Sequence, residues 1–213
     1  DMTGAHLAEA DMSRADLSGA ILTGANLAWA NLRKALLFDA AMSGADLRRA
    51  NLSYTEADGV DMSGATLVKA DLTGAVMTAA NISGADLTEA NLSAATLADV
   101  DLSGARLIAA NLTGAVLSGA NLAGADLTGA RLRGADLNGV DFTGADLSGA
   151  TLRRSQLSEA TLAGARFVDA DLRGVDLTDL DFSAADMTGA NLAGAILCRT
   201  VLPTGEENGG CIE

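Results

Sequence analysis

The sequence predicts an all-β fold, a solenoid in which the chain coils repeatedly and stacks into a rod. The first observation is that a large apolar residue, which we call the centre, recurs every five residues. Between Ala5 and Arg199 there are 39 complete pentapeptides, with 29 Leu, five Met, three Phe, one Ile and one Ala as centres. The second is that 32 of the 39 residues two positions before a centre are Ala. The third is a column of glycines spaced by twenty residues, from Gly4 to Gly164.

A period of five fits neither a continuous helix nor a flat strand. A helix advances about 100° per residue, so the apolar stripe would spread around its surface. In a strand, a centre and the Ala two residues before it point the same way, but the next Ala, three residues later, would point outwards. The chain must therefore turn a corner in every pentapeptide, and coils with repeated corners stack into a solenoid.

The glycines indicate how many corners a coil has. Of the 24 glycines, 21 lie two positions after a centre, and in one of the four columns of period twenty nine of ten residues are Gly. The other three columns hold three, five and four glycines. Glycine is favoured where φ is positive or where a side chain would collide with a neighbour. One special position in twenty indicates four sides per coil and about ten coils over residues 1–200. We number the sides in chain order, so that the first side begins at residues 1, 21 and 41.

One stretch, YTEADGV, departs from the pattern because its centre shrinks to Ala57. Thr55 and Val60 occupy positions where Ala is usual. The first interpretation is local compensation, in which Val60 fills the volume that Ala57 leaves. The alternative is a bulge that redirects Tyr54 and Glu56.

The chain is acidic, with 28 Asp and Glu against 14 Lys and Arg and a net charge of −14. This balance argues against a nucleic-acid binder, which neutralises phosphates with Lys and Arg. The position before the centre holds 17 of the acids and three bases. Asp and Asn are favoured at corners because their side chains bond to the local backbone, so the acidity is largely a product of the fold. The first side carries the candidate acidic face, which consists of Asp61, Asp101, Asp141 and Asp181.

A basic stripe crosses the third side. Arg133, Arg153 and Arg173 are spaced by twenty residues and are expected to stack, with Arg131 and Arg154 beside them. Like charges on neighbouring strands repel each other. The stripe is therefore either a solvated surface or a site for an anion or a partner.

Apolar residues also occupy positions that the coil turns outwards. Single exposed apolar residues are normal, but clusters of them mark interfaces. We expect a patch on the fourth side and its corner to contact a protein partner or a second copy of the chain, as in a dimer. The alternatives are incidental exposure and contact with another part of the chain. The patch consists of Ile21, Trp29, Leu36, Phe38, Val76 and Val116.

The sequence contains no recognisable catalytic, cofactor or metal motif. The single histidine, His6, has no partner at a recognisable spacing, and there is no phosphate-binding loop, dinucleotide fingerprint or zinc spacing. No apolar run approaches the ~18 residues that a membrane span needs. We therefore expect a protein that is not an enzyme, needs no cofactor, does not bind nucleic acid directly and does not cross a membrane.

The repeats end near Arg199, which predicts a solenoid over residues 1–200 and a capping tail over 201–213. The open end of a solenoid recruits other strands and needs a cap. Cys198 and Cys211 bracket the tail, and we favour a disulfide that fastens it over the end, with two free thiols as the alternative. A disulfide implies an oxidising compartment.

Repeats such as ADLTG, ANLAG, ADLSG and ANLTG resemble the pentapeptide-repeat family, whose motif is A(D/N)LXX. The resemblance covers residues 1–200 and implies a right-handed quadrilateral β-helix. It also implies an alternative function, because the best-studied branch of the family protects DNA gyrase from quinolones by resembling duplex DNA. That branch tends to have Phe- or Cys-rich repeats, loops that interrupt the coil and a C-terminal dimerisation segment, whereas here leucine dominates and no loop breaks the frame.

The segment CRTVLPTGEENGGC is similar to the tails of exported pentapeptide-repeat proteins of photosynthetic lineages, which implies the periplasm or the thylakoid lumen. Because the chain begins with Asp1, we expect an upstream segment to have been removed. The sequence thus predicts an exported, rigid, non-enzymatic scaffold for protein–protein contact. The alternative is a cytoplasmic DNA mimic that binds DNA gyrase or another topoisomerase.

Overall fold

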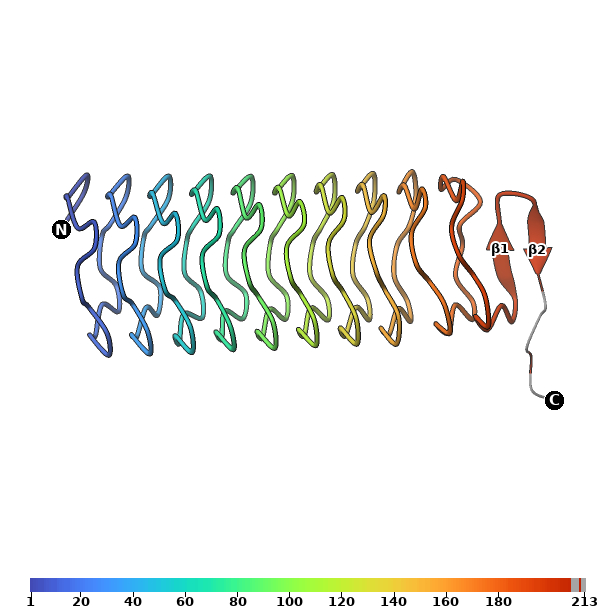
Figure 1. Cartoon of the computed structure of the whole chain (residues 1–213), viewed down its shortest axis with the longest axis horizontal. Helices are drawn as coiled ribbons and strands as arrows, with labels where there is room; N and C mark the ends of the chain where they lie inside the picture. The colour runs from blue at the N-terminus through green and yellow to red at the C-terminus, as the bar shows by residue number, and fades with distance from the viewer. Residues whose placement is uncertain (208–210, 212–213) are drawn as a thin grey trace.

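The computed structural model describes residues 1–207 and 211, so residues 208–210 and 212–213 of the predicted capping tail lie outside the described residues. The chain forms a straight stack of coils, with the N-terminus at one end and the tail at the other (Figure 1). The named strands are β1 (Thr200–Leu202) and β2 (Gly205–Glu207). Among the residues described, no helix has the length and apolar character needed to cross a membrane.

Each coil takes twenty residues. Parallel bridges join residues that are twenty apart, beginning with His6–Asn26 and ending with Asp181–Val201. Within every twenty residues the chain makes four turns, and each turn separates two short extended stretches. The backbone is therefore an all-β solenoid with four sides, as the spacings of five and twenty predict.

Backbone hydrogen bonds join each coil to the next. The N–H of a centre donates to the carbonyl nineteen residues later, as from Leu112 to Arg131 at 2.7 Å. The N–H of the residue before a centre donates to the carbonyl twenty-one residues earlier, as from Asn111 to Ala90 at 2.9 Å. Because both kinds of bond recur on all four sides, each coil fixes the register of its neighbour.

The turns have one backbone conformation in common. The residue two positions after the centre has a positive φ on all four sides, 57° for Arg49 and 63° for Gly84, and among the described repeats only Ala184 departs from this rule. The glycine column that begins at Gly4 is therefore not distinguished by its backbone angle. At most of its positions a side chain would meet no atom within 4 Å, so nothing in the structure explains the preference for glycine on that side.

Leucine and alanine fill the interior. From Leu22 to Phe182 every centre is at most 2% exposed, and the alanines two positions before them are buried beside them except Ala20 and Ala160, which are partly buried. Phe167 and Phe182 pack edge to face, with ring centroids 5.5 Å apart. Each buried large apolar side chain contributes roughly 1.5–3 kcal/mol, so this continuous interior is the main source of stability.

The departure around Ala57 does not produce a bulge. The bridges through Glu56 keep the twenty-residue register, which shows that the bulge interpretation is wrong. Ala57 and Val60 are both fully buried, in agreement with local compensation. The buried hydroxyl of Thr55 donates to the Leu52 carbonyl at 2.9 Å and is thereby satisfied.

The hydrogen bonding between two of the described coils is interrupted. Between residues 154–163 and the coil that follows, the regular bonds from the N–H groups of Leu157, Glu159 and Leu162 are missing. Cavities of about 270 and 310 Å³ lie between the coils at this place. In the following coil Leu180 occupies a position where Ala is usual, and it is only 3% exposed. We attribute the separation to the extra volume of this side chain.

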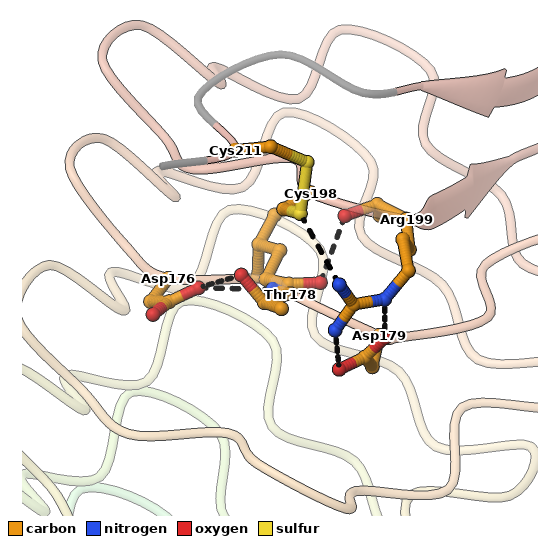
Figure 2. The surroundings of a disulfide bond; sticks show 8 residues. Asp176, Thr178, Asp179, Cys198, Arg199 and Cys211 are labelled. Carbon is orange, nitrogen blue, oxygen red and sulfur yellow. Dashed lines mark hydrogen bonds and ion pairs between the residues drawn. A yellow bond between two sulfur atoms is a disulfide. The ribbon is translucent and has the colours of Figure 1, made fainter. Parts of the chain in front are cut away.

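A disulfide and a hairpin finish the described chain. Cys198 and Cys211 form the predicted disulfide, with 4.7 Å between their Cα atoms (Figure 2). Next to it, Arg199 donates to both carboxylate oxygens of Asp179, at 2.5 and 2.6 Å. Strands β1 and β2 pair antiparallel, and Leu202 of β1 is partly buried against the interior. The disulfide, the ion pair and this leucine together hold the tail to the end of the stack.

Candidate interaction surfaces

Asp side chains before the centres are held by the turns that follow them. The Asp61 carboxylate accepts a hydrogen bond from the N–H two residues later at 3.0 Å. The other members of the predicted acidic face, Asp101, Asp141 and Asp181, make the same bond at 2.8–2.9 Å. The side chain and N–H of Ser183 lower the pKa of Asp181. These four carboxylates therefore stabilise turns as well as carrying charge.

The acidic face is not a continuous row of free carboxylates. The side-chain amide of Asn81 donates to Asp61 at 3.2 Å, and that of Asn121 donates to Asp101 at 3.1 Å. Asn81 and Asn121 thus lie between Asp residues of this column and use some of the acceptor capacity of their neighbours, and Thr161 separates Asp141 from Asp181. The face is acidic but interrupted.

The residues of the predicted apolar patch lie in three separate places on the rod. Leu36, Val76 and Val116 lie in one column of the fourth side, and Phe38 lies at the corner that ends this side. Ile21 lies at the start of the first side, and Trp29 lies at the corner between the second and third sides, away from the rest. The exposed residues are Ile21, Trp29 and Val116, whereas Leu36, Phe38 and Val76 are half-buried.

The charges are segregated around the rod. We define the basic side as the third side together with the turns at its two borders, which are positions 8–14 of each twenty-residue coil. This side holds eleven of the 14 bases and six of the 28 acids. The remainder of the chain holds three bases and 22 acids. A chain with a net charge of −14 therefore presents one side with an excess of positive charge.

Half of the bases form no ion pair within the described residues, and all of these lie on the basic side. Bases elsewhere are paired: Arg106 binds Asp86 at 3.1 Å, and Arg166 binds Asp146 at 2.6 Å, both on the second side. The bases without an ion pair are Arg14, Arg33, Lys34, Arg49, Arg131, Arg133 and Arg154.

The predicted basic stripe is brought together along three consecutive coils, but one carboxylate neutralises part of it. Asp171 accepts from Arg153 at 2.7 Å and from Arg173 at 2.8 Å. Both arginines therefore have a partner within the chain. The other members of the stripe are exposed and unpaired in the part of the chain that the structure describes, and these are Arg131, Arg133 and Arg154.

The single Trp and the single Tyr of the chain lie at the two borders of the basic side, and each pairs with an arginine. The Arg49 guanidinium lies over the Trp29 ring, 4.6 Å from its centroid, and the Arg33 guanidinium lies over the Tyr54 ring at 5.1 Å. Tyr54 also lies against Gly74 of the following coil, where a Cβ would be 2.9 Å from the ring. Trp29 is 57% exposed and Tyr54 is 50% exposed.

Sequence reasoning placed Trp29 in the apolar patch and missed the pairing of Tyr54 with Arg33. A signal for both pairs was present in the spacing. Arg49 follows Trp29 by twenty residues, and Tyr54 follows Arg33 by twenty-one, so each pair belongs to consecutive coils. A search of the outward columns for aromatic–arginine neighbours would have found them.

No group of three or more His, Cys, Asp and Glu side chains is placed to hold a metal ion among the residues that the structure describes. A cavity of about 370 Å³ near the tail is lined in part by Met187, Leu192, Leu202 and Pro203. It lies where the hairpin meets the last coil, so it belongs to the packing of the tail.

The sequence matches the family model for pentapeptide repeats in eight copies, over residues 1–37, 30–67, 58–93, 101–139, 141–179 and 165–202. The structure is similar to the crystal structure of HetL, a pentapeptide repeat protein involved in heterocyst differentiation regulation from the cyanobacterium Nostoc sp. strain PCC 7120. The two chains are 34% identical, the match covers 92% of this chain and 91% of HetL, and the TM-score is 0.81.

A second similar structure is a trypsin-treated form of QnrB1, a plasmid-mediated fluoroquinolone resistance protein. It is 24% identical, with 81% of this chain and 89% of that chain covered and a TM-score of 0.65. This likeness concerns the fold alone. No curated protein sequence matched the chain.

Proposed function

Because the chain belongs to the pentapeptide-repeat family, we propose that it is a non-enzymatic scaffold whose outer faces contact a protein partner. The proposed scaffold is a right-handed, four-sided rod of about ten coils. The observation that carries the proposal is the constant register of the described stack, from His6–Asn26 to Asp181–Val201. It holds the outward side chains of successive coils at fixed spacing, and solenoids use such extended surfaces for binding.

The likeness to HetL supports this proposal. HetL is described as taking part in the regulation of differentiation, and it matches this chain over nine-tenths of both lengths. A regulatory role through contact suits a rod whose interior is filled by leucine and alanine.

Affinity capture tests the scaffold proposal directly. The intact, oxidised chain is immobilised and exposed to an extract of its native compartment, with a tagged unrelated protein as the background control. We expect at least one protein to be retained at a near-equimolar ratio after a wash at physiological salt. Retention of background proteins alone contradicts the proposal, and inhibition of gyrase supercoiling by sub-micromolar protein would favour the DNA-mimic function instead.

We also propose that the apolar column of the fourth side takes part in the contact. Phe38→Asp adds a charge beside Leu36, whereas Thr143→Asp adds the same charge at an exposed position of the first side whose hydroxyl makes no hydrogen bond in the described structure. We expect the first variant to lose most of the captured partner and the second to keep it. Equal capture by both variants contradicts a role for this column.

We further propose that the protein is exported and works in an oxidising compartment, either the periplasm or the thylakoid lumen. The support is the disulfide between Cys198 and Cys211, which are the two cysteines of the chain. Thiols of cytosolic proteins are ordinarily kept reduced. Protein taken from its native compartment and treated with a polyethylene-glycol maleimide without reductant should show no shift on a gel. A shift by two labels contradicts the proposal.

A further inference from the structure

We propose that the basic side is a docking surface for an acidic protein segment, with the Arg49–Trp29 and Arg33–Tyr54 pairs as its anchors. The inference rests on the proposed scaffold function, because it names the surface of the scaffold and the chemistry of the partner. The first argument is charge: this side holds eleven bases and six acids, whereas the remainder of the sequence holds three bases and 22 acids. A carboxylate-rich segment is complementary to this side and is repelled by the others.

The second argument is that the two anchoring arginines are oriented over rings but have no carboxylate partner among the described side chains. Within the described residues, the guanidinium groups of Arg33 and Arg49 donate no hydrogen bond, whereas Arg106 and Arg166 each donate to an Asp. An arginine held over a ring keeps its N–H groups available for a bidentate bond to a carboxylate. Part of the side-chain entropy is already lost before binding, so a partner gains more from the contact.

The third argument is that the residues at the two borders of the basic side are of the types that protein interfaces favour. Trp, Tyr and Arg are the residues that dominate the binding energy of protein interfaces. Three of the four phenylalanines are fully buried as centres, and the fourth, Phe38, is half-buried on another side. The basic side therefore carries both aromatic side chains that are at least half exposed.

The surroundings of the rings favour a protein over a sugar or a nucleic acid. Sugars and bases stack on an open aromatic face. Arg33 belongs to the coil before Tyr54 and Gly74 to the coil after it, so the ring is covered from both directions along the rod. Arg49 covers one face of the Trp29 ring.

The length of the docked segment follows from the coil spacing. A second group of bases, Arg131, Arg133 and Arg154, forms no ion pair with any described residue. It lies about five coils from the aromatic pairs, which is ~24 Å at ~4.8 Å per coil. An extended chain covers ~3.3 Å per residue, so about eight residues reach from one group to the other. The proposed ligand is an extended acidic segment of this length or longer.

Binding of a labelled peptide tests the proposal. The probe is a twelve-residue oligoglutamate with a terminal fluorescein, titrated with the intact oxidised chain and followed by fluorescence anisotropy at 50 and 150 mM salt. Emission from Trp29, the only tryptophan, is a second signal from the proposed site. We expect saturable binding that weakens at the higher salt concentration, together with a change in the Trp29 emission. No binding at 50 mM salt overturns the proposal.

Two double variants that lose the same charge distinguish specific contacts at the proposed site from a general effect of the protein's net charge on peptide binding. Arg33→Gln with Arg49→Gln removes the anchors, and Arg106→Gln with Arg166→Gln removes two paired arginines of the second side. Circular dichroism checks that both variants fold. We expect the first to weaken peptide binding at least tenfold and the second less than twofold. Equal weakening overturns the proposal, as does tighter binding of a labelled twelve-base-pair DNA than of the peptide.

The same variants distinguish this inference from the scaffold function on which it rests. If the anchor variant captures the native partner as well as the unchanged chain does, the scaffold function stands and the basic-side docking surface is wrong. If the unchanged chain captures no partner at all, the scaffold function itself is wrong. Loss of the partner from the anchor variant alone supports both.

Discussion

Asp and Asn share the position before the centre and perform the same task in the turn, but they differ toward the neighbouring coil. Both accept a hydrogen bond from the N–H two residues later, as do Asp101 and Asn121. Only Asn can also donate, and Asn121 does so to Asp101. Carboxylates stacked on neighbouring strands repel each other. An amide between two carboxylates therefore removes a repulsion without changing the turn.

We expect the stability of the fold to fall in acid. The side chain and N–H of Ser18 lower the pKa of Asp16 below its ordinary value of 3.8, and those of Thr188 do the same for Asp186. A carboxyl group with a lowered pKa stabilises the folded state when it is ionised, so its contribution is complete above about pH 4 and is lost as the pH falls through the folded-state value. Urea unfolding at pH 7, 5, 3 and 2 at constant ionic strength should show a midpoint that is steady above pH 5 and decreases below pH 4. A midpoint that does not change down to pH 2 contradicts this explanation.

A comparison of two glycines measures the packing of Tyr54. Both Gly74 and Gly84 have a positive φ, near 62°, but a Cβ would be 2.9 Å from the Tyr54 ring at Gly74 and would meet nothing within 4 Å at Gly84. We expect Gly84→Ala to cost about 1 kcal/mol of unfolding free energy and Gly74→Ala about 1–2 kcal/mol more. Equilibrium denaturation of both variants, repeated with Tyr54→Ala, gives the coupling. The extra cost at Gly74 should vanish in the Tyr54→Ala background, and its persistence contradicts the contact.

Whole coils behave alike except where an inward residue is too large. In the column of Leu180, the preceding coils alternate between alanine and valine, and the N–H groups of Val60, Val100 and Val140 make long turn bonds of 3.2–3.4 Å. The regular inter-coil bonds persist beside each of these valines, so the stack stays closed there. Leucine at the same position is the larger side chain, and the regular bonds from Leu157, Glu159 and Leu162 are missing in the described stack.

Hydrogen exchange should locate this interruption. In the described stack the amides of Leu157, Glu159 and Leu162 make no regular inter-coil bond, whereas the equivalent amides one coil earlier, Leu137, Gly139 and Phe142, donate at 2.8 Å. We expect the first three to exchange at least about a hundredfold faster than the second three, because unbonded amides exchange without a cooperative opening. Leu180→Ala should slow the fast set by allowing the coils to approach. Equal protection of the two sets contradicts the interruption.

The predictable part of this fold is the part that repeats. The spacings of five and twenty predict the coils, the corners and the buried centres, because one backbone conformation recurs and each deviation would displace every later centre. The effect of Leu180 was not predicted, since it depends on how much volume one corner can absorb. The aromatic pairs were missed because Arg33 and Tyr54 meet only after the coils are placed in register. The pairing of Cys198 with Cys211 was predicted because each stands at a border of the tail.

At the scale of the whole molecule, the coils contact only their neighbours in the stack, and the four sides carry different charge. Such a rod loses stability locally, since a change in one coil is felt mainly by the coils beside it. The tail is an extreme case because it has a neighbour on one side only. Its attachment therefore depends on the Cys198–Cys211 disulfide and on the packing of Leu202 against the interior.

Removing the disulfide should release the tail and leave the rod folded. A loop of about a dozen residues closed by a disulfide gains about 3 kcal/mol, so Cys198→Ser with Cys211→Ser should speed tryptic cleavage after Arg199 by at least about tenfold. The far-UV spectrum and the cleavage rate after Arg173 serve as controls and should not change. Mass spectrometry identifies the products. Unchanged cleavage after Arg199 contradicts a fastening role for the disulfide.

The twenty-residue register has a consequence for how such a chain can change in length. Inserting or deleting twenty residues adds or removes one coil and leaves every later side chain on its own side, because bridges always join residues twenty apart. Inserting or deleting five residues keeps each leucine inside but rotates everything beyond it by a quarter turn. The arginines of the basic stripe beyond the change would then move onto an acidic neighbouring side, away from Arg33 and Arg49. Inserting or deleting a single pentapeptide therefore leaves the packing of the core unchanged but rearranges the outward side chains on the surface.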